Sequence, residues 1–167
     1  MKFVALVFGV VAMYIVMRIL GHTHGDIGIT RQRTIYSLKT VLPITIVLVI
    51  AAGLFLLLEK PRFSPTEGVG FYMFYILISC PAQELLFRGI LSRILQELRL
   101  RRSLELGVAA ALFGYVHIIY GDMLTVVVMS IVGLFWYRAY QRSSNLIGVT
   151  ISHVVLGVMT IALGIIN

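Results

Sequence analysis

Residues 69–91, with the sequence VGFYMFYILISCPAQELLFRGIL, form an apolar run long enough to cross a bilayer as one helix. Two charged side chains, Glu84 and Arg88, interrupt this run one helical turn apart. Each charge at membrane depth costs at least about 2.5–3.5 kcal/mol on insertion scales. Such residues persist where they are paired and face a protein interior or a wet cavity. The segment therefore predicts a membrane helix with a polar site built into it.

The rest of the chain has the same apolar character. Of its 167 residues, 59% are hydrophobic and 13% are charged, against about 45–50% and about 25% in a soluble domain. Long continuous runs indicate helices rather than the alternating strands of a membrane barrel. We predict an all-α polytopic bundle that forms one integral-membrane domain over residues 1–167, with its motif-bearing core at about 69–167. Six spans are predicted, namely Phe3–Leu20, Val41–Leu58, Val69–Leu91, Leu104–Tyr120, Met123–Tyr137 and Asn145–Ile166.

Local features refine this plan. The third span is expected to continue as an amphipathic helix to about Leu98, because apolar residues recur at helical spacing. Pro81 is expected to kink it, since proline frees a backbone carbonyl one turn earlier. Aromatic residues near span ends are expected at the membrane surface, and they are Tyr115, Tyr120, Trp136 and Tyr137. Close helix packing is predicted at four glycines, Gly68, Gly70, Gly114 and Gly157.

Basic residues predict the orientation. The first, third and fifth connections carry most of them: Arg18, Arg31, Arg33, Lys39, Arg93, Arg99, Arg101, Arg102, Arg138 and Arg142. The opposite side carries only Lys2, Lys60 and Arg62. By the positive-inside rule the basic connections are cytoplasmic and both termini lie outside. This placement also explains the net charge of +7 without a nucleic-acid partner.

Three spans carry ionisable side chains at comparable depth. With a helical rise of about 1.5 Å per residue, Glu84 and His117 lie roughly 20 Å from the cytoplasmic ends of their spans, and His153 lies roughly 12 Å in. All three fall within a hydrocarbon core of about 30 Å, so we predict that they form one site. A site near the midplane or beyond it favours an exported substrate tail, and hence the plasma (inner) membrane of a bacterium or archaeon.

These side chains suit hydrolysis. A glutamate poised between an arginine partner and desolvation can act as a general base for water, and histidine can shuttle protons or support a developing oxyanion. Glu84, His117 and His153 also resemble the His₂Glu ligand set of catalytic zinc sites. The spacing is not H-E-x-x-H and each ligand comes from a different helix, so we expect no metal and keep zinc as the alternative.

Other interpretations of single residues stay open. Glu84 and Arg88 alone are equally suited to a structural ion pair. Cys80 can be a nucleophile beside a histidine or a small buried packing residue. The turn at residues 21–26, GHTHGD, can hold a metal or simply be solvated.

Taken together, the motifs resemble those of the CPBP (Abi) intramembrane glutamic proteases, relatives of the CAAX prenyl endopeptidases and of bacteriocin-processing enzymes. Their pattern is E-E-x-x-x-R, F-x-x-x-H and H-x-x-x-N on successive helices. The corresponding stretches here are Gln83–Arg88, Phe113–His117 and His153–Gly157, the last preceded by Asn145-Leu146. The resemblance implies that positions 83, 84, 88, 117 and 153 are catalytic.

Two positions depart from the family pattern. Gln83 stands where the family uses a glutamate to activate water, and Gly157 stands where an asparagine helps to form the oxyanion site. Either Glu84 has taken over as the base, or position 83 was altered to trap an inactive form, or the chain is a non-catalytic relative. Backbone amides, Gln83 or Arg88 can replace the missing asparagine.

The resulting hypothesis is an intramembrane endopeptidase that cleaves a membrane-anchored or lipid-modified peptide, such as a C-terminal sorting signal or a leader. Glu84 would activate water with His117, His153 would polarise the scissile carbonyl, and Arg88 would hold Glu84. The alternatives are an inactive relative that acts as a membrane scaffold or chaperone, and a small proton-coupled transporter. The absence of a repeat in the sequence argues against the transporter.

Overall fold

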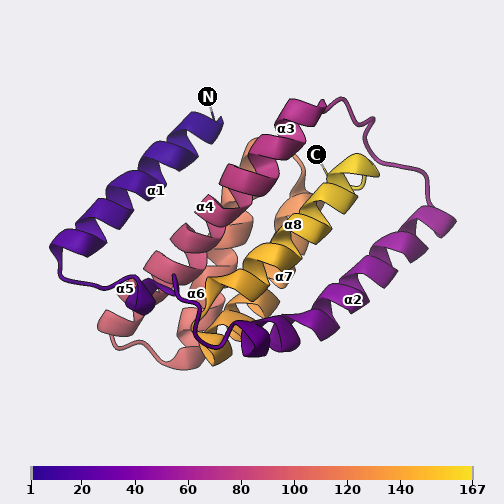
Figure 1. Cartoon of the computed structure of the whole chain (residues 1–167). Helices are drawn as coiled ribbons and strands as arrows, with labels where there is room; N and C mark the ends of the chain where they lie inside the picture. Colours follow the sequence, from indigo (N-terminus) through magenta and orange to yellow (C-terminus); the bar gives the residue numbers. More distant parts are fainter. Residues whose placement is uncertain (1, 167) are drawn as a thin grey trace.

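The computed structural model describes residues 2–166, so Met1 and Asn167 of the predicted domain lie outside it. The described chain is helical and contains no strand, which confirms the all-α prediction. Figure 1 shows a helical bundle in which the N- and C-termini lie on the same side. The α-helices are α1 (Lys2–Ile19), α2 (Thr34–Leu58), α3 (Val69–Phe74), α4 (Cys80–Glu84), α5 (Leu91–Glu97), α6 (Arg102–Tyr115), α7 (Met123–Ser143) and α8 (Leu146–Ala162).

The helices follow the predicted apolar segments. Within residues 2–166, four continuous helical stretches are long and apolar enough to cross a membrane, and they are Thr34–Leu58, Val69–Glu97, Arg102–Tyr120 and Met123–Ser143. Two further apolar helices, Val4–Ile19 and Leu146–Ala162, are shorter. The chain is therefore an integral membrane protein. The number of crossings and the side on which the termini lie stay predictions.

Several helices end at other residues than the predicted spans. The helix of the fifth span extends past Tyr137, because α7 continues to Ser143 and ends at Ser144 in the left-handed conformation. The last helix stops at Ala162, before Gly164 turns the chain with φ 65°. α2 likewise begins before its predicted span. Hydropathy marks the apolar part of a helix, whereas the capping of its last hydrogen bonds decides where the helix ends.

The third segment is not a uniform α-helix. Residues Tyr75–Ser79 and Leu85–Ile90 are π-helical and flank α4. The Cys80 N–H donates to the Tyr75 carbonyl five residues back, and Pro81 follows with no N–H to donate. The disturbance expected at Pro81 therefore takes the form of a changed hydrogen-bond spacing. A π turn holds an extra residue, so it redirects the side chains that follow.

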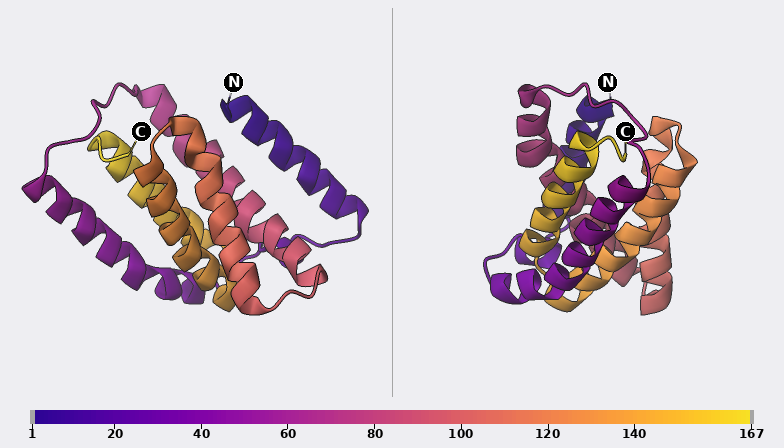
Figure 2. Two further views of the ribbon diagram at one scale, coloured as in Figure 1. Left: turned by 180° about the vertical axis from the view of Figure 1, so that it is seen from behind. Right: turned by 90° about the vertical axis from the view of Figure 1, so that its right-hand side faces the viewer.

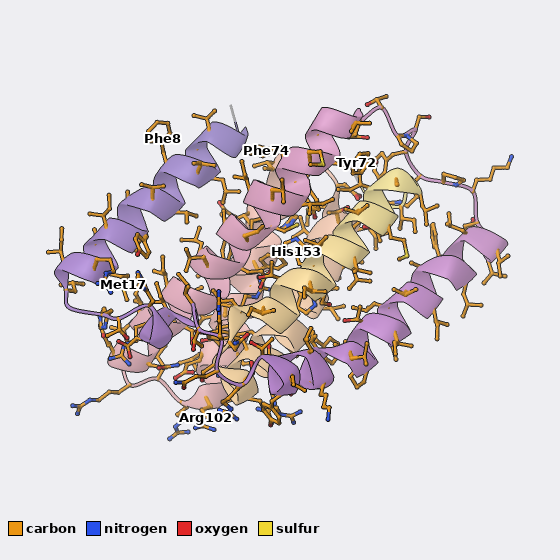
Figure 3. All side chains as sticks on the ribbon, in the orientation of Figure 1. Phe8, Met17, Tyr72, Phe74, Arg102 and His153 are labelled. Atoms are coloured by element: carbon orange, nitrogen blue, oxygen red, sulfur yellow. The ribbon has the colours of Figure 1, made fainter. Side chains whose placement is uncertain are left out.

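The core lies where α2, α6, α7 and α8 pack together. Its buried residues include Phe113, Trp136 and Leu156. α1 lies at the edge of the bundle (Figure 2), and its Phe8 points outward (Figure 3). The many exposed apolar side chains of the outer helix faces are suited to contact lipid. Figure 3 also shows Arg102 at the end of the bundle opposite the chain termini.

Two of the four predicted packing glycines are in close contact with another helix. A Cβ added at Gly114 of α6 would lie 2.8 Å from the Val126 carbonyl oxygen of α7, and one at Gly157 would lie 2.0 Å from the Tyr75 hydroxyl. At Gly68 and Gly70 nothing lies within 4 Å, so the prediction is wrong there. These two glycines lie where α3 begins, away from any neighbouring helix.

Gly148 provides a test of the contact between α2 and α8. A Cβ there would lie 2.6 Å from the backbone carbonyl of Ser37, so Gly148→Ala is expected to lower the unfolding free energy by about 1–3 kcal/mol through overpacking. Gly53→Ala in α2 is the control, because nothing lies within 4 Å of a Cβ added there. Alanine is more favourable than glycine inside a helix by about 0.5–1 kcal/mol. Unfolding in detergent measures both. Equal stability of the two variants would contradict the close contact.

Candidate active site

Glu84 and Arg88 lie inside the bundle, beside α8. They are 0% and 1% exposed. Arg88 Nη1 lies 3.2 Å from Glu84 Oε1, and His153 Nδ1 lies 2.7 Å from the same oxygen. An ionised carboxylate only accepts hydrogen bonds, so the His153 Nδ1–H is the donor. One carboxylate oxygen thus holds both an arginine of its own helix and a histidine of α8.

Aromatic rings enclose the arginine. Its guanidinium carbon lies 3.9 Å from the ring centre of Phe113 and 5.3 Å from that of Trp136, which stabilises the cation through the ring faces. Within the described residues, Glu84 Oε2 and both terminal nitrogens of Arg88 have no well-aligned hydrogen-bond partner. Buried polar atoms without such partners are costly, and a folded protein retains few of them.

His117 is held in a similar way to His153. α6 ends in a 3₁₀ turn, Val116–Tyr120, and His117 Nδ1 lies 2.7 Å from the carbonyl oxygen of Phe113. A carbonyl also only accepts, so Nδ1 again carries the proton. Both histidines are therefore oriented through Nδ1, and Nε2 is left in each as the basic ring nitrogen.

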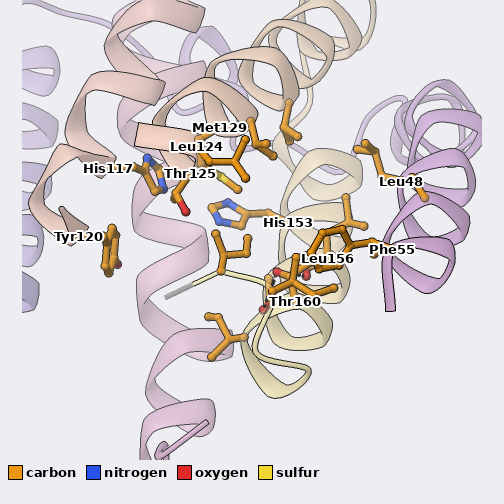
Figure 4. Close-up of a pocket in the computed structure, with 18 of the residues that line it drawn as sticks. Leu48, Phe55, His117, Tyr120, Leu124, Thr125, Met129, His153, Leu156 and Thr160 are labelled. Carbon is orange, nitrogen blue, oxygen red and sulfur yellow. Dashed lines mark hydrogen bonds between the residues drawn. The ribbon is translucent and has the colours of Figure 1, made fainter. Parts of the chain in front are cut away.

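Both imidazoles line one cavity of about 370 Å³. Figure 4 shows His117 and His153 projecting toward it from different helices, with Leu48 and Phe55 of α2 on the far side. Much of the wall is apolar and comes from α2, α7 and α8. The cavity therefore offers two basic nitrogens to a largely apolar occupant.

The predicted site residues fall into two groups. Four line the cavity, and they are Gln83, His117, His153 and Gly157. The other four do not belong to its wall and are buried, and they are Cys80, Glu84, Arg88 and Phe113. Glu84 therefore contacts His153 rather than the cavity, while its neighbour Gln83 faces the cavity. The Gln83 amide nitrogen donates to Ser79 Oγ at 3.0 Å.

Sequence reasoning missed two aromatic residues of the site. Trp136, which was expected at the membrane surface along with Tyr137, is 2% exposed. Its ring lies 4.7 Å from that of His153, and its indole N–H donates to Ser152 Oγ at 2.9 Å. Trp136 and Tyr137 are both buried, because α7 continues past them to Ser143 and they do not lie at its end. Tyr75 lines the cavity beside Gly157, and no motif marks it.

Asn145, which precedes the last motif, fixes the start of α8. Its buried amide donates to the backbone carbonyls of Thr30 and Gln32 at 2.7 and 2.8 Å. Its Oδ1 accepts from the Ile147 N–H at 2.8 Å. The connection between α1 and α2 is thereby tied to the helix that carries His153.

An ion pair lies at the end of the cavity that is lined by the C-terminal residues Ile165 and Ile166. Arg62, which lines the cavity, donates to both carboxylate oxygens of Asp122 at 2.8 and 3.1 Å. Asp122 also caps α7 by accepting from Thr125. The backbone N–H groups of Arg62 and Phe63 donate to the Gly164 carbonyl. The connection after α2 is thus fastened across the ends of α7 and α8.

This ion pair predicts a pH dependence. Hydrogen bonds from Arg62, followed by those from Thr125, lower the pKa of Asp122 below its ordinary value. A lowered folded-state pKa contributes stability above the unfolded pKa of about 3.9 that is lost as the pH falls through the folded value. The thermal midpoint of the wild type should therefore exceed that of Asp122→Asn at pH 7, and the gap should narrow below about pH 4. A gap independent of pH would contradict this linkage.

The two histidines of the turn at residues 21–26 each contact a side chain of another element. His22 Nε2 lies 3.0 Å from Glu97 Oε1, and His24 Nε2 lies 2.6 Å from the Tyr14 hydroxyl. Hydrogen bonds from Thr23 lower the pKa of Asp26. Between residues 2 and 166, no group of three or more metal-ligating side chains is placed to hold an ion.

Fold and site together define a helical integral membrane protein with a buried carboxylate–histidine pair beside an apolar cavity. The model of a protein family described as type II CAAX prenyl endopeptidase Rce1-like matches residues 65–159. The chain belongs to this family, and at the level of the family it is a CAAX-type intramembrane protease. The matched region includes all three motifs. Comparisons with curated proteins and with solved structures found no match.

Proposed function

We propose that the protein is an intramembrane endopeptidase that hydrolyses a membrane-anchored or lipid-modified peptide segment, such as a C-terminal sorting signal or a leader. One observation carries the proposal. His153 donates its Nδ1–H to a fully buried carboxylate while its ring lines the cavity. This is the arrangement in which a carboxylate orients an imidazole and stabilises the imidazolium that forms when it takes a proton.

In the proposed reaction, a water molecule in the cavity loses a proton to His153 Nε2 as its oxygen adds to the scissile carbonyl carbon. The tetrahedral intermediate then collapses, and the C–N bond breaks. The imidazolium returns the proton to the leaving nitrogen, which leaves a carboxyl and an amine product. His117 Nε2, a second acceptor on the same cavity, orients the water. Glu84 stays ionised throughout.

This scheme gives Glu84 a positioning role rather than direct contact with water, because its carboxylate is 0% exposed and bound to His153. Arg88 offsets its charge. A glutamine at position 83 has no basic group, so the loss of the family glutamate is compensated by a histidine base. The proposed site takes an extended apolar segment along α2, and we propose the plasma membrane of a prokaryote as its location.

The test is a cleavage assay in liposomes with exported proteins that carry C-terminal anchor segments. Wild type, His153→Ala, Gln83→Glu and a chelator-treated sample are compared. Cleavage by the wild type that is lost in His153→Ala and insensitive to chelator supports the proposal. Cleavage only by Gln83→Glu would make position 83 the base and this chain a disabled form. Loss of cleavage with chelator would indicate a metal enzyme. No cleavage by any sample would favour the scaffold.

A further inference from the structure

Peptide hydrolysis needs a hydrogen-bond donor for the oxyanion that develops on the scissile carbonyl oxygen. Both histidines present an acceptor nitrogen to the cavity in the resting state. Several other donors on the cavity wall are already engaged. The Thr125 hydroxyl donates to Asp122, the Trp136 indole to Ser152, and the Thr160 hydroxyl to a backbone carbonyl of α8.

The Tyr75 hydroxyl is placed differently. It rests directly on the backbone of Gly157, where a Cβ would lie 2.0 Å from its oxygen. Gly157 follows His153 by one turn of α8, so the two positions share a helix face. The Tyr75 ring packs edge-on against the His153 imidazole at 6.1 Å. Only a glycine at position 157 allows a hydroxyl to lie there, next to the proposed base.

The surroundings keep this hydroxyl ready to donate. Its side chain is buried and packs against the ring of Phe71 at 5.9 Å, so the phenol is held in place. Its hydrogen-bond partner is the Cys80 thiol, with Tyr120 and Glu84 as further polar neighbours, and sulfur is a weak acceptor. A developing oxyanion is a much stronger acceptor and would attract the hydrogen bond.

We propose that the Tyr75 hydroxyl is a catalytic hydrogen-bond donor to the oxyanion. This inference rests on the proposed peptidase function. Tyr75 keeps its proton throughout, and the hydrogen bond strengthens as charge moves onto the carbonyl oxygen. The Gln83 amide, which also lines the cavity, donates one hydrogen to Ser79 and has a second to offer as a supporting donor.

Kinetics of Tyr75→Phe test the proposal. Removing one oxyanion donor lowers kcat by about 10²–10³-fold, and KM should change little because the donor acts mainly in the transition state. Tyr72→Phe is the matched control, because it removes the same hydroxyl from the same segment but from a residue that does not line the cavity. Its kcat should equal that of the wild type.

A swap of the donor gives the second test. Tyr75→Leu is expected to lower kcat by the same factor as Tyr75→Phe, and it also frees the space over Gly157. Adding Gly157→Asn to Tyr75→Leu then supplies an amide donor from α8 and should recover at least tenfold in kcat. Full kcat in Tyr75→Phe, with activity lost in His153→Ala, would overturn this inference and leave the peptidase function intact. No cleavage by the wild type would overturn both.

Discussion

Replacing His153 by alanine is expected to lower kcat by about 10²–10⁴-fold, the range for loss of a positioned general base. The imidazole is the group that joins the buried carboxylate to the cavity, through the 2.7 Å contact with Glu84. Without it, the cavity wall has no basic nitrogen that a buried carboxylate orients. Single-turnover cleavage in liposomes measures the chemical step directly.

A control for this variant lies two residues further along the same helix. Val155 is 45% exposed and does not line the cavity, so Val155→Ala should keep the wild-type rate. His117→Ala should lose less activity than His153→Ala, because the His117 Nδ1–H donates to a neutral carbonyl rather than to a carboxylate. A larger loss in His117→Ala would identify His117 as the base instead.

Removing the carboxylate is expected to have the largest effect on stability. In Glu84→Ala the guanidinium of Arg88, 1% exposed, loses its anionic partner. Breaking a buried ion pair by removing one member typically costs about 3–5 kcal/mol, because the remaining charge is uncompensated. Equilibrium unfolding in detergent measures this loss. An unchanged unfolding free energy would contradict the pairing of Glu84 with Arg88.

The double variant Glu84→Leu, Arg88→Met separates stability from catalysis. Replacing both members of a buried ion pair by apolar residues of similar size is often neutral or stabilising, so its unfolding free energy should return close to that of the wild type. Its peptidase activity should be lost, as in Glu84→Ala, because in both variants His153 has no carboxylate partner. A stable and fully active double variant would rule out the positioning role of Glu84.

The sequence by itself determined where the helices lie and which of them carry polar groups. Continuous apolar runs separated by basic connections can form only membrane helices, since backbone groups in lipid must be hydrogen-bonded within the segment. Because burying an unpaired charge in a membrane is costly, the sequence predicts that Glu84 and Arg88 pair with each other. Similar depth predicted that the histidines of two other helices join them, and both do lie around one cavity beside the buried pair.

Only the tertiary structure decided which side chain faces the cavity. Gln83 and Glu84 are neighbours in the sequence, yet Gln83 lines the cavity and Glu84 lies behind His153. α4, which carries both residues, lies between two π-helical turns, and hydrophobic periodicity does not reveal such turns because an extra residue shifts the pattern. The contact of Tyr75 with Gly157 likewise joins helices far apart in the chain. Such contacts arise from packing between helices, which no spacing within one segment encodes.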